Sequence, residues 1–173
     1  ILASIKILLS KYTEQQDIIL GTVVAGRQDS DLEDQIGFYV NTLALRNQVD
    51  PNDSFLTFFE KVKKNTLSAF SHQIYPFNLL VEDLNLKMDK GRHSIFEILF
   101  SFNNTASNNF YLDETDTEDI NDLGFTTSIK DLEFLFQEYG DCLSFQINFN
   151  SELYDCNTIK RFMVHYKKML FEL

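Results

Sequence analysis

The spacing of apolar residues changes repeatedly along the chain, and this alternation restricts the fold more than any other feature. Residues 1–12 place apolar side chains at helical spacing, whereas Asp17–Ala25 is a nearly continuous apolar run, typical of a strand covered on both faces. Both kinds of pattern return further on. The other predicted helices are Phe55–Ser71, a short one from Pro76 to about Leu84, and Thr158–Leu173; the other predicted strands lie in Ile36–Arg46, Ile95–Phe102, Leu132–Phe136 and Leu143–Phe149.

This order of helices and strands predicts an α/β (α+β) layered sandwich, with a mixed β-sheet flanked by helices. Tyr139-Gly140-Asp141 should join the last two strands as a hairpin. A chain of 173 residues with 44% hydrophobic residues, among them 17 Phe, is long and apolar enough for one well-packed core. We therefore expect a single domain over residues 1–173.

The charge of the chain excludes one class of partner. Twenty-six acidic residues stand against 15 basic ones, a net charge of −11, so a nucleic-acid surface is not expected. Residues 105–129 hold six carboxylates and no Lys or Arg. This stretch lacks the Gly turn and terminal Glu of a calcium loop, so a solvated loop is expected and no metal site. No apolar run approaches the length of a membrane span, so no membrane partner is expected.

Cysteine usage points to a reducing compartment. Cys142 and Cys156 are typical of free thiols in a cytoplasmic protein, one beginning a strand and the other a helix. No neighbouring base supports a catalytic thiol.

Three segments of the sequence are candidate motifs. Gly21–Arg27 ends the first apolar run, Ile36–Arg46 carries an Asn-Thr pair inside a strand pattern, and His72–Phe77 separates two helices. Asn is depleted in strands, so the pair is unusual. In this order the segments resemble the condensation domains of nonribosomal peptide synthetases. The family's strand motif IGxFxNTxxxR is matched by Ile36, Gly37, Val40, Asn41, Thr42 and Arg46, and its HQxxPFE motif by His72, Gln73, Pro76 and Phe77, with Asn78 in place of Glu.

A third family motif, RDxSRNPLF, is degraded here. Asp89, Arg92 and Phe96 match it, and the neighbouring positions depart from it. The strand that follows, Phe96–Asn104, is similar to the family's apolar strand ending in Gln-Asn, with Asn103 in the Gln position.

The resemblance covers only the second half of such a domain and implies a chloramphenicol-acetyltransferase-like half-domain. The family's catalytic signature HHxxxDG belongs to the preceding half. This chain has three histidines, His72, His93 and His165, and no His-His pair. We therefore expect no catalytic residue in this fragment, although the parent would be an acyltransferase.

The resemblance also implies a reaction and its partners. An amine on one carrier protein attacks the acyl or peptidyl thioester on another, and both substrates arrive on phosphopantetheine arms held by the carriers. No cofactor is bound directly. The expected partners are the missing N-terminal half and the carrier proteins. The apolar seam that the other half would cover is exposed in the isolated chain, which predicts its self-association.

The resemblance implies that the phosphopantetheine arms enter a channel between the two halves, and several residues are candidates for roles beside this channel. Asn41 would donate to the substrate arm or fix its own strand, and Ser101, Asn103 and Asn104 would bind pantetheine amides or simply end a strand. His72 is expected to cap backbone groups beside Pro76, and His165 to be a partly buried packing residue. Arg27 and Arg46 either attract the pantetheine phosphate or stay in solvent. Gly37, Thr42, Gln73, Phe77 and Arg92 are expected to be structural parts of the motifs.

Two other functions stay open. A noncatalytic relative would keep the fold as a platform for carrier proteins or tailoring enzymes, which the degraded third motif and Asn78 permit. An epimerisation or cyclisation domain would share the fold and change the chemistry.

Overall fold

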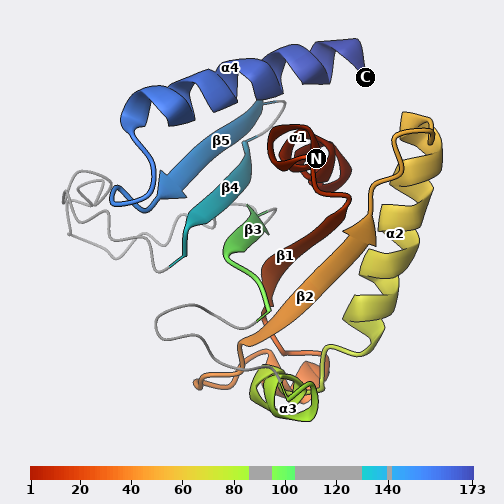
Figure 1. Ribbon diagram of the computed structural model, residues 1–173. Coiled ribbons are helices and arrows are strands. Elements are labelled where there is room, and N and C mark those ends of the chain that lie inside the picture. Colours follow the sequence, from red (N-terminus) through yellow and green to blue (C-terminus); the bar gives the residue numbers. More distant parts are fainter. Residues whose placement is uncertain (86–94, 104–129, 140–141) are drawn as a thin grey trace, which may run out of the picture.

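A computed structural model describes residues 1–85, 95–103, 130–139 and 142–173. The described elements alternate as the sequence predicts (Figure 1). In chain order they are α1 (Leu2–Thr13), β1 (Asp17–Val24), the 3-10 turn η1 (Ser30–Leu32), β2 (Asn41–Gln48), α2 (Phe55–Ser71), α3 (Phe77–Asp83), β3 (Ile98–Asn103), β4 (Leu132–Tyr139), β5 (Cys142–Phe149) and α4 (Cys156–Glu172).

The five strands form one mixed sheet in the order β2-β1-β3-β4-β5. β1, β3 and β4 run parallel, and the two edge strands, β2 and β5, run antiparallel to their neighbours. Tyr139 pairs with Cys142, which confirms the predicted hairpin between β4 and β5. The start of β2 and the ends of β1 and β3 therefore meet at one end of the sheet.

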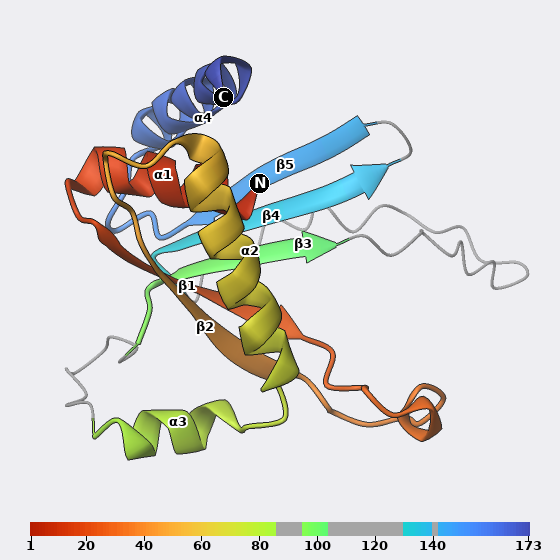
Figure 2. The same cartoon turned by 90° about the vertical axis from the view of Figure 1, so that its right-hand side faces the viewer.

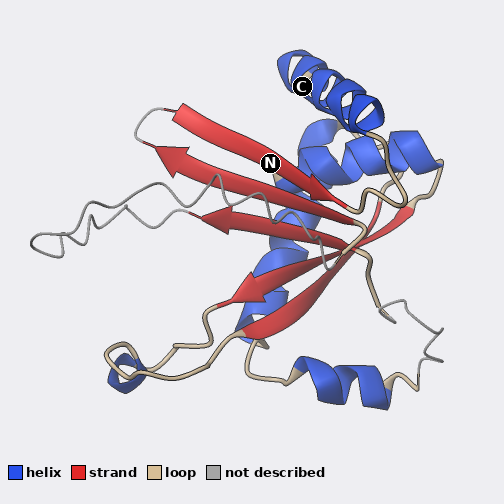
Figure 3. Cartoon of the chain, turned by 90° about the vertical axis from the view of Figure 1, so that its left-hand side faces the viewer, coloured by secondary structure: helices blue, strands red, loops and turns tan. Residues whose placement is uncertain are grey.

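Helices α1, α2 and α4 pack on the same face of this sheet, called here the helix face (Figure 2). Figure 3 views the sheet from its other side, called here the open face, which none of these three helices covers. The largest core cluster joins α1, β1, β3, β4 and α4. Phe134, Phe136 and Phe162 are each at most 7% exposed, and burial of such a side chain contributes roughly 1.5–3 kcal/mol.

Two buried polar side chains fix α1 between its neighbours. The Ser4 hydroxyl lies 3.0 Å from the Tyr166 hydroxyl of α4. Lys6, which is fully buried, donates to Leu45 O at 2.7 Å and to Asn47 Oδ1 at 2.6 Å. Buried polar groups are costly unless paired, so these contacts favour one register of α1 against α4 and β2.

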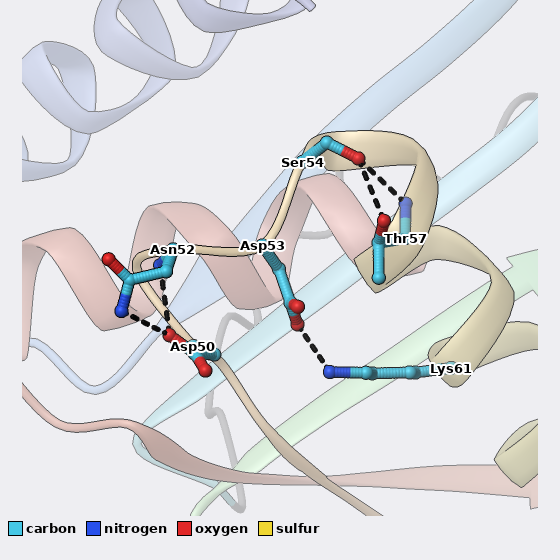
Figure 4. A network of polar contacts seen from close by, with 6 residues as sticks. All are labelled: Asp50, Asn52, Asp53, Ser54, Thr57 and Lys61. Carbon is cyan, nitrogen blue, oxygen red and sulfur yellow. Dashed lines mark hydrogen bonds and ion pairs between the residues drawn. The ribbon is translucent and has the colours of Figure 1, made fainter.

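The start of α2 is fixed by polar contacts of the turn before it (Figure 4). Asp50 Oδ1 accepts from the backbone and side chain of Asn52, and Ser54 caps the helix by accepting from Thr57 N at 3.2 Å. Asp53 pairs with Lys61 across two helical turns at 2.5 Å. The Ser54 contact satisfies a donor that a helix start leaves without an intrahelical partner, and the two aspartates brace the turn before it.

Three local predictions were wrong. The Asn-Thr pair lies at the start of β2 and not inside the strand, because residues 26–40 form a loop held by its own hydrogen bonds. β1 is covered on both faces only in part, since Gly21 is buried on the open face whereas Val23 on the same face is 44% exposed. Phe96, which the predicted strand Ile95–Phe102 includes, lies before β3, because this strand begins at Ile98.

Two features of the molecular surface complete the description. Cys142 and Cys156 are exposed free thiols at the starts of β5 and α4, where the sequence predicted them. Over the described ranges, the helices lack the combination of length and hydrophobicity that crossing a membrane requires.

Candidate functional site where the sequence motifs meet

Asn41, at the start of β2, is bonded to the segment between α2 and α3. Its Nδ2 donates to Gln73 O at 2.7 Å and to Tyr75 O at 2.8 Å, and its Oδ1 accepts from Phe77 N at 3.2 Å. Both amide hydrogens and one carbonyl lone pair are thereby used. The Asn of the strand motif therefore fixes the backbone of the His72–Phe77 motif, which lies more than thirty residues later.

The ring of Phe96 extends this junction to two further motifs. It lies 5.6 Å from the Phe77 ring, centroid to centroid, and over the backbone of Gly21. A Cβ atom at Gly21 would come within 2.0 Å of the Phe96 ring, so this position requires glycine for the close approach. Lys130 Nζ lies 4.4 Å from the Phe96 ring centroid. Burial lowers the pKa of Lys130, an effect that Glu97 and Asp131 oppose.

The loop of residues 26–40 stands beside this junction and is braced internally. The Arg27 guanidinium stacks on the Tyr39 ring at 4.5 Å and donates to Gly37 O at 3.1 Å and to Leu32 O. Gly26 has a φ of +68°, and a Cβ there would meet Tyr39 O at 1.9 Å. Arg27 therefore does not stay free in solvent, which corrects one alternative drawn from the sequence, and phosphate binding by Arg27 stays a prediction.

A cavity of about 530 Å³ lies between this loop and the segment that Asn41 fixes. Tyr39, Val40 and Asn41 line one side, and Gln73, Ile74 and Pro76 line the other. Gln28, Asp29 and Asn78 add polar groups. Because this cavity lies between two of the motifs, it is a candidate ligand site.

The predicted substrate-binding residues separate onto two faces of the sheet. Alternation along β2 places Asn41 on the helix face with Leu43, and alternation along β3 places Ser101 and Asn103 on the open face, opposite Phe100. All three lie at the same end of the sheet, with β1 between β2 and β3, so their strands are about 10 Å apart. The structure does not combine them into one pocket.

The open face carries a chain of polar contacts that sequence reasoning missed. Gln146 Nε2 donates to Asn148 Oδ1 at 2.7 Å, and Asn148 Nδ2 donates to Glu133 Oε2 at 3.0 Å, from β5 to β4. The alternation of polar residues along β5 can be read from the sequence. That Glu133 lies opposite Asn148 follows only from the register of β4 against β5.

His72 caps the end of α2, and not the backbone groups beside Pro76 that the sequence suggested. Its Nδ1 lies 2.8 Å from Ser68 O, which also accepts from Ser71 Oγ at 2.7 Å. Because a carbonyl only accepts, Nδ1 must carry the proton, and the Ser71 hydroxyl proton is also used. The pair at 3.1 Å is therefore a cap at the end of α2 and not a base beside a nucleophile.

Two other predicted polar residues have partners that differ from the prediction. Arg46 is bidentate to Asp17, with Nη2 2.6 Å from Oδ2 and Nε 2.9 Å from Oδ1, and this contact lowers the pKa of Asp17. His165 is exposed, not partly buried, and its Nδ1 lies 2.6 Å from the Tyr12 hydroxyl. Arg92, His93, Asn104 and residues 105–129 lie outside the described residues.

Comparison with known proteins agrees with this junction of motifs. The condensation domain model matches residues 1–173. The chain is 41% identical to tyrocidine synthase 3 of Brevibacillus parabrevis over 98% of its own length, and it spans 3% of that protein. Among solved structures, holo-AB3403, a four-domain nonribosomal peptide synthetase bound to AMP and glycine, has a TM-score of 0.86 at 19% identity, covering 99% of this chain and 14% of that one. The X-domain from teicoplanin biosynthesis, in complex with OxyB, has a TM-score of 0.77 at 20% identity, covering 95% and 37%. The chain belongs to the condensation domain family.

Proposed function

We propose that this chain is the C-terminal half of a condensation domain that joins two carrier-bound substrates by an amide bond. The family match over residues 1–173 carries this proposal. The acceptor amine attacks the donor thioester carbonyl, the new C–N bond forms, the C–S bond breaks, and the carrier thiol leaves with a proton. The base that takes the proton from the amine would come from the N-terminal half, since this chain has no HHxxxDG sequence.

This chain would supply the framework of the channel. Asn41 would act as a positioning residue, because its carboxamide is used by Gln73, Tyr75 and Phe77. Ser101, Asn103 and Asn104 would bind amides of the phosphopantetheine arms from the open face of the sheet. The arms belong to acyl and peptidyl carrier proteins, so the chain itself would hold no cofactor.

Large exposed apolar side chains support the need for a covering partner. Phe38 is 89% exposed, Ile74 78% and Phe171 82%. We infer that the missing half covers part of this surface, and that the isolated cytoplasmic chain self-associates through it.

The proposal is tested by joining this chain to an N-terminal half that carries HHxxxDG. Loaded donor and acceptor carriers are added, and the condensed product is measured by mass spectrometry. We expect product, its loss when the second His is replaced by Ala, and a reduced rate for the Ser101→Ala/Asn103→Ala variant. Lys11→Met, on the exposed part of α1, is the matched control.

A folded joined domain that binds carriers but forms no product would refute the amide-forming function and favour the platform. The fold is compatible with that alternative, since the X-domain was solved in complex with OxyB. Inversion of a carrier-bound amino acid without condensation would instead indicate an epimerisation domain.

A further inference from the structure

Glu133, near the start of β4, places a carboxylate on the open face of the sheet. Leu132 and Phe134, its neighbours in the strand, are buried in the core, so alternation turns the Glu133 side chain to the face that Figure 3 views. This side chain is half-buried. Over the described residues its one hydrogen-bonding partner is Asn148, and no cationic side chain pairs with it. The carboxylate can therefore accept a cation that this part of the chain does not supply.

Two amide side chains of β5 hold this carboxylate in place. Gln146 Nε2 donates to Asn148 Oδ1 at 2.7 Å, and Asn148 Nδ2 donates to Glu133 Oε2 at 3.0 Å. The second oxygen, Oε1, accepts from none of the described residues, so it is available to a ligand. A carboxylate that is already fixed loses little conformational entropy when it binds a cation.

The surface around Glu133 on β3 and β4 is largely apolar. Its partner in the register of β3 is Leu99, and the next residue of β4 on the open face is Leu135; both leucines are half-buried. Beyond Leu99, the Phe96 ring covers Gly21 of β1. A ligand group that fits this surface has an aliphatic stem, which packs on the two leucines, and a positive charge at its end. The side chain of lysine, an ammonium on a stem of four carbons, has this character.

The register of β3 against β4 places Glu133 where a phosphopantetheine arm would end. Asn103, Ser101 and Leu99 are successive residues of β3 on the open face, about 6.6 Å apart. An arm that enters at the end of the sheet beside Asn103, and bonds through its amides to Asn103 and Ser101, carries its acyl group toward Leu99. Glu133 lies directly beside Leu99 on the next strand, about 4.8 Å away between backbones.

We propose that Glu133 is a specificity-determining residue, which binds the side-chain ammonium of a carrier-bound amino acid such as lysine. This role of Glu133 rests on the proposed function, because that function places the arms on the open face. When the missing half covers this face it removes water from Glu133, and a carboxylate with neither water nor a cation is costly. An ammonium on the substrate offsets this cost, whereas a neutral side chain of the same length does not.

The test measures binding to the domain that is joined to an N-terminal half carrying HHxxxDG. The ligands are pantetheine derivatives that carry lysine or norleucine through an amide in place of the thioester, so no reaction is needed. By isothermal titration calorimetry we expect lysine to bind at least about tenfold more tightly, a difference of about 1.4 kcal/mol. Glu133→Gln should remove this difference, and Glu133→Asp, which keeps the charge, should retain part of it. Glu138→Gln, an exposed position on the opposite side of the same strand, is the matched control.

Charge reversal gives a second arm, since Glu133→Lys should bind a glutamate-loaded ligand more tightly than a lysine-loaded one. Equal affinity of the wild type for lysine and norleucine would overturn the proposal and would indicate that a cation of the missing half pairs with Glu133. A preference for lysine that Glu133→Gln leaves intact would overturn it as well. A joined domain that prefers lysine but forms no product refutes condensation alone, whereas one that forms product without this preference refutes the role of Glu133 alone.

Discussion

Asn41 Oδ1 accepts a hydrogen bond from Phe77 N at 3.2 Å and so joins the start of β2 to the first turn of α3. Phe77 N is one of the donors that a helix start leaves without an intrahelical partner, and Pro76 before it has no N–H. A side chain from a distant strand therefore supplies the cap that the local sequence lacks.

Asn41→Ala should destabilise the chain by about 2–3 kcal/mol. The substitution removes three hydrogen bonds, each worth about 1 kcal/mol net, and leaves Gln73 O, Tyr75 O and Phe77 N without this partner. Urea denaturation measures the loss, with Asn157→Ala, an exposed position in α4, as the control. Equal stability of the two variants would contradict the structural role of Asn41 and return it to the list of channel residues.

Gly21→Ala should destabilise the chain by about 1–3 kcal/mol through a steric clash alone. The added Cβ would lie 2.0 Å from the Phe96 ring, which must move away from Phe77 to admit it. In a Phe96→Leu background the same substitution should cost less. A double-mutant cycle measures this difference, and strict additivity would show that Gly21 and Phe96 do not interact.

The sequence predicted the helices and most strands well, because their apolar spacing reports local burial. The prediction failed where contacts between residues far apart in the sequence determine the local structure. The pattern of Ile36–Val40 is that of a strand, but Arg27 and Tyr39 hold these residues in a loop. The opposite faces of Asn41 and Ser101 follow from alternation within each strand. The sequence could not predict that their two strands lie in one sheet with β1 between them, because this follows from the pairing of β1 with both β2 and β3.

Arg46→Lys should leave the free energy of unfolding nearly unchanged. The contact with Asp17 is bidentate, but the two side chains are 66% and 38% exposed, and exposed ion pairs contribute little. A lysine cannot make the bidentate contact, so a small loss of stability is expected. Because about 1 M salt screens the ion pair, the difference in stability between the two chains should be smaller still at high salt. If the joined domain nevertheless lost activity with this variant, Arg46 would have a role in substrate binding as well. A large loss of stability would contradict the assignment of this contact as a surface ion pair.

Lys6 should make the stability of the chain depend on pH. Burial lowers the pKa of Lys6 from 10.5 to about 7, and Asp17 opposes this shift only in part. The surroundings of the ammonium explain the direction: its acceptors, Leu45 O and Asn47 Oδ1, are neutral, and Asp17 is engaged by Arg46. A neutral amine has two N–H donors, and these two acceptors satisfy both.

Between pH 7 and 10.5 the unfolded chain therefore holds a proton that the folded chain lacks, and the free energy of unfolding rises with pH across this window. Below pH 7 both states hold the proton, so the penalty stays at its full value. Above 10.5 both are neutral and the penalty disappears. Lys6→Met removes this titration, so we expect the stability of the wild type relative to this variant to rise by on the order of 3–5 kcal/mol from pH 7 to 10.5. Urea denaturation at several pH values measures the difference, with Lys11→Met on the exposed part of α1 as the control. A constant difference between wild type and Lys6→Met over that range would mean that the folded chain keeps Lys6 charged.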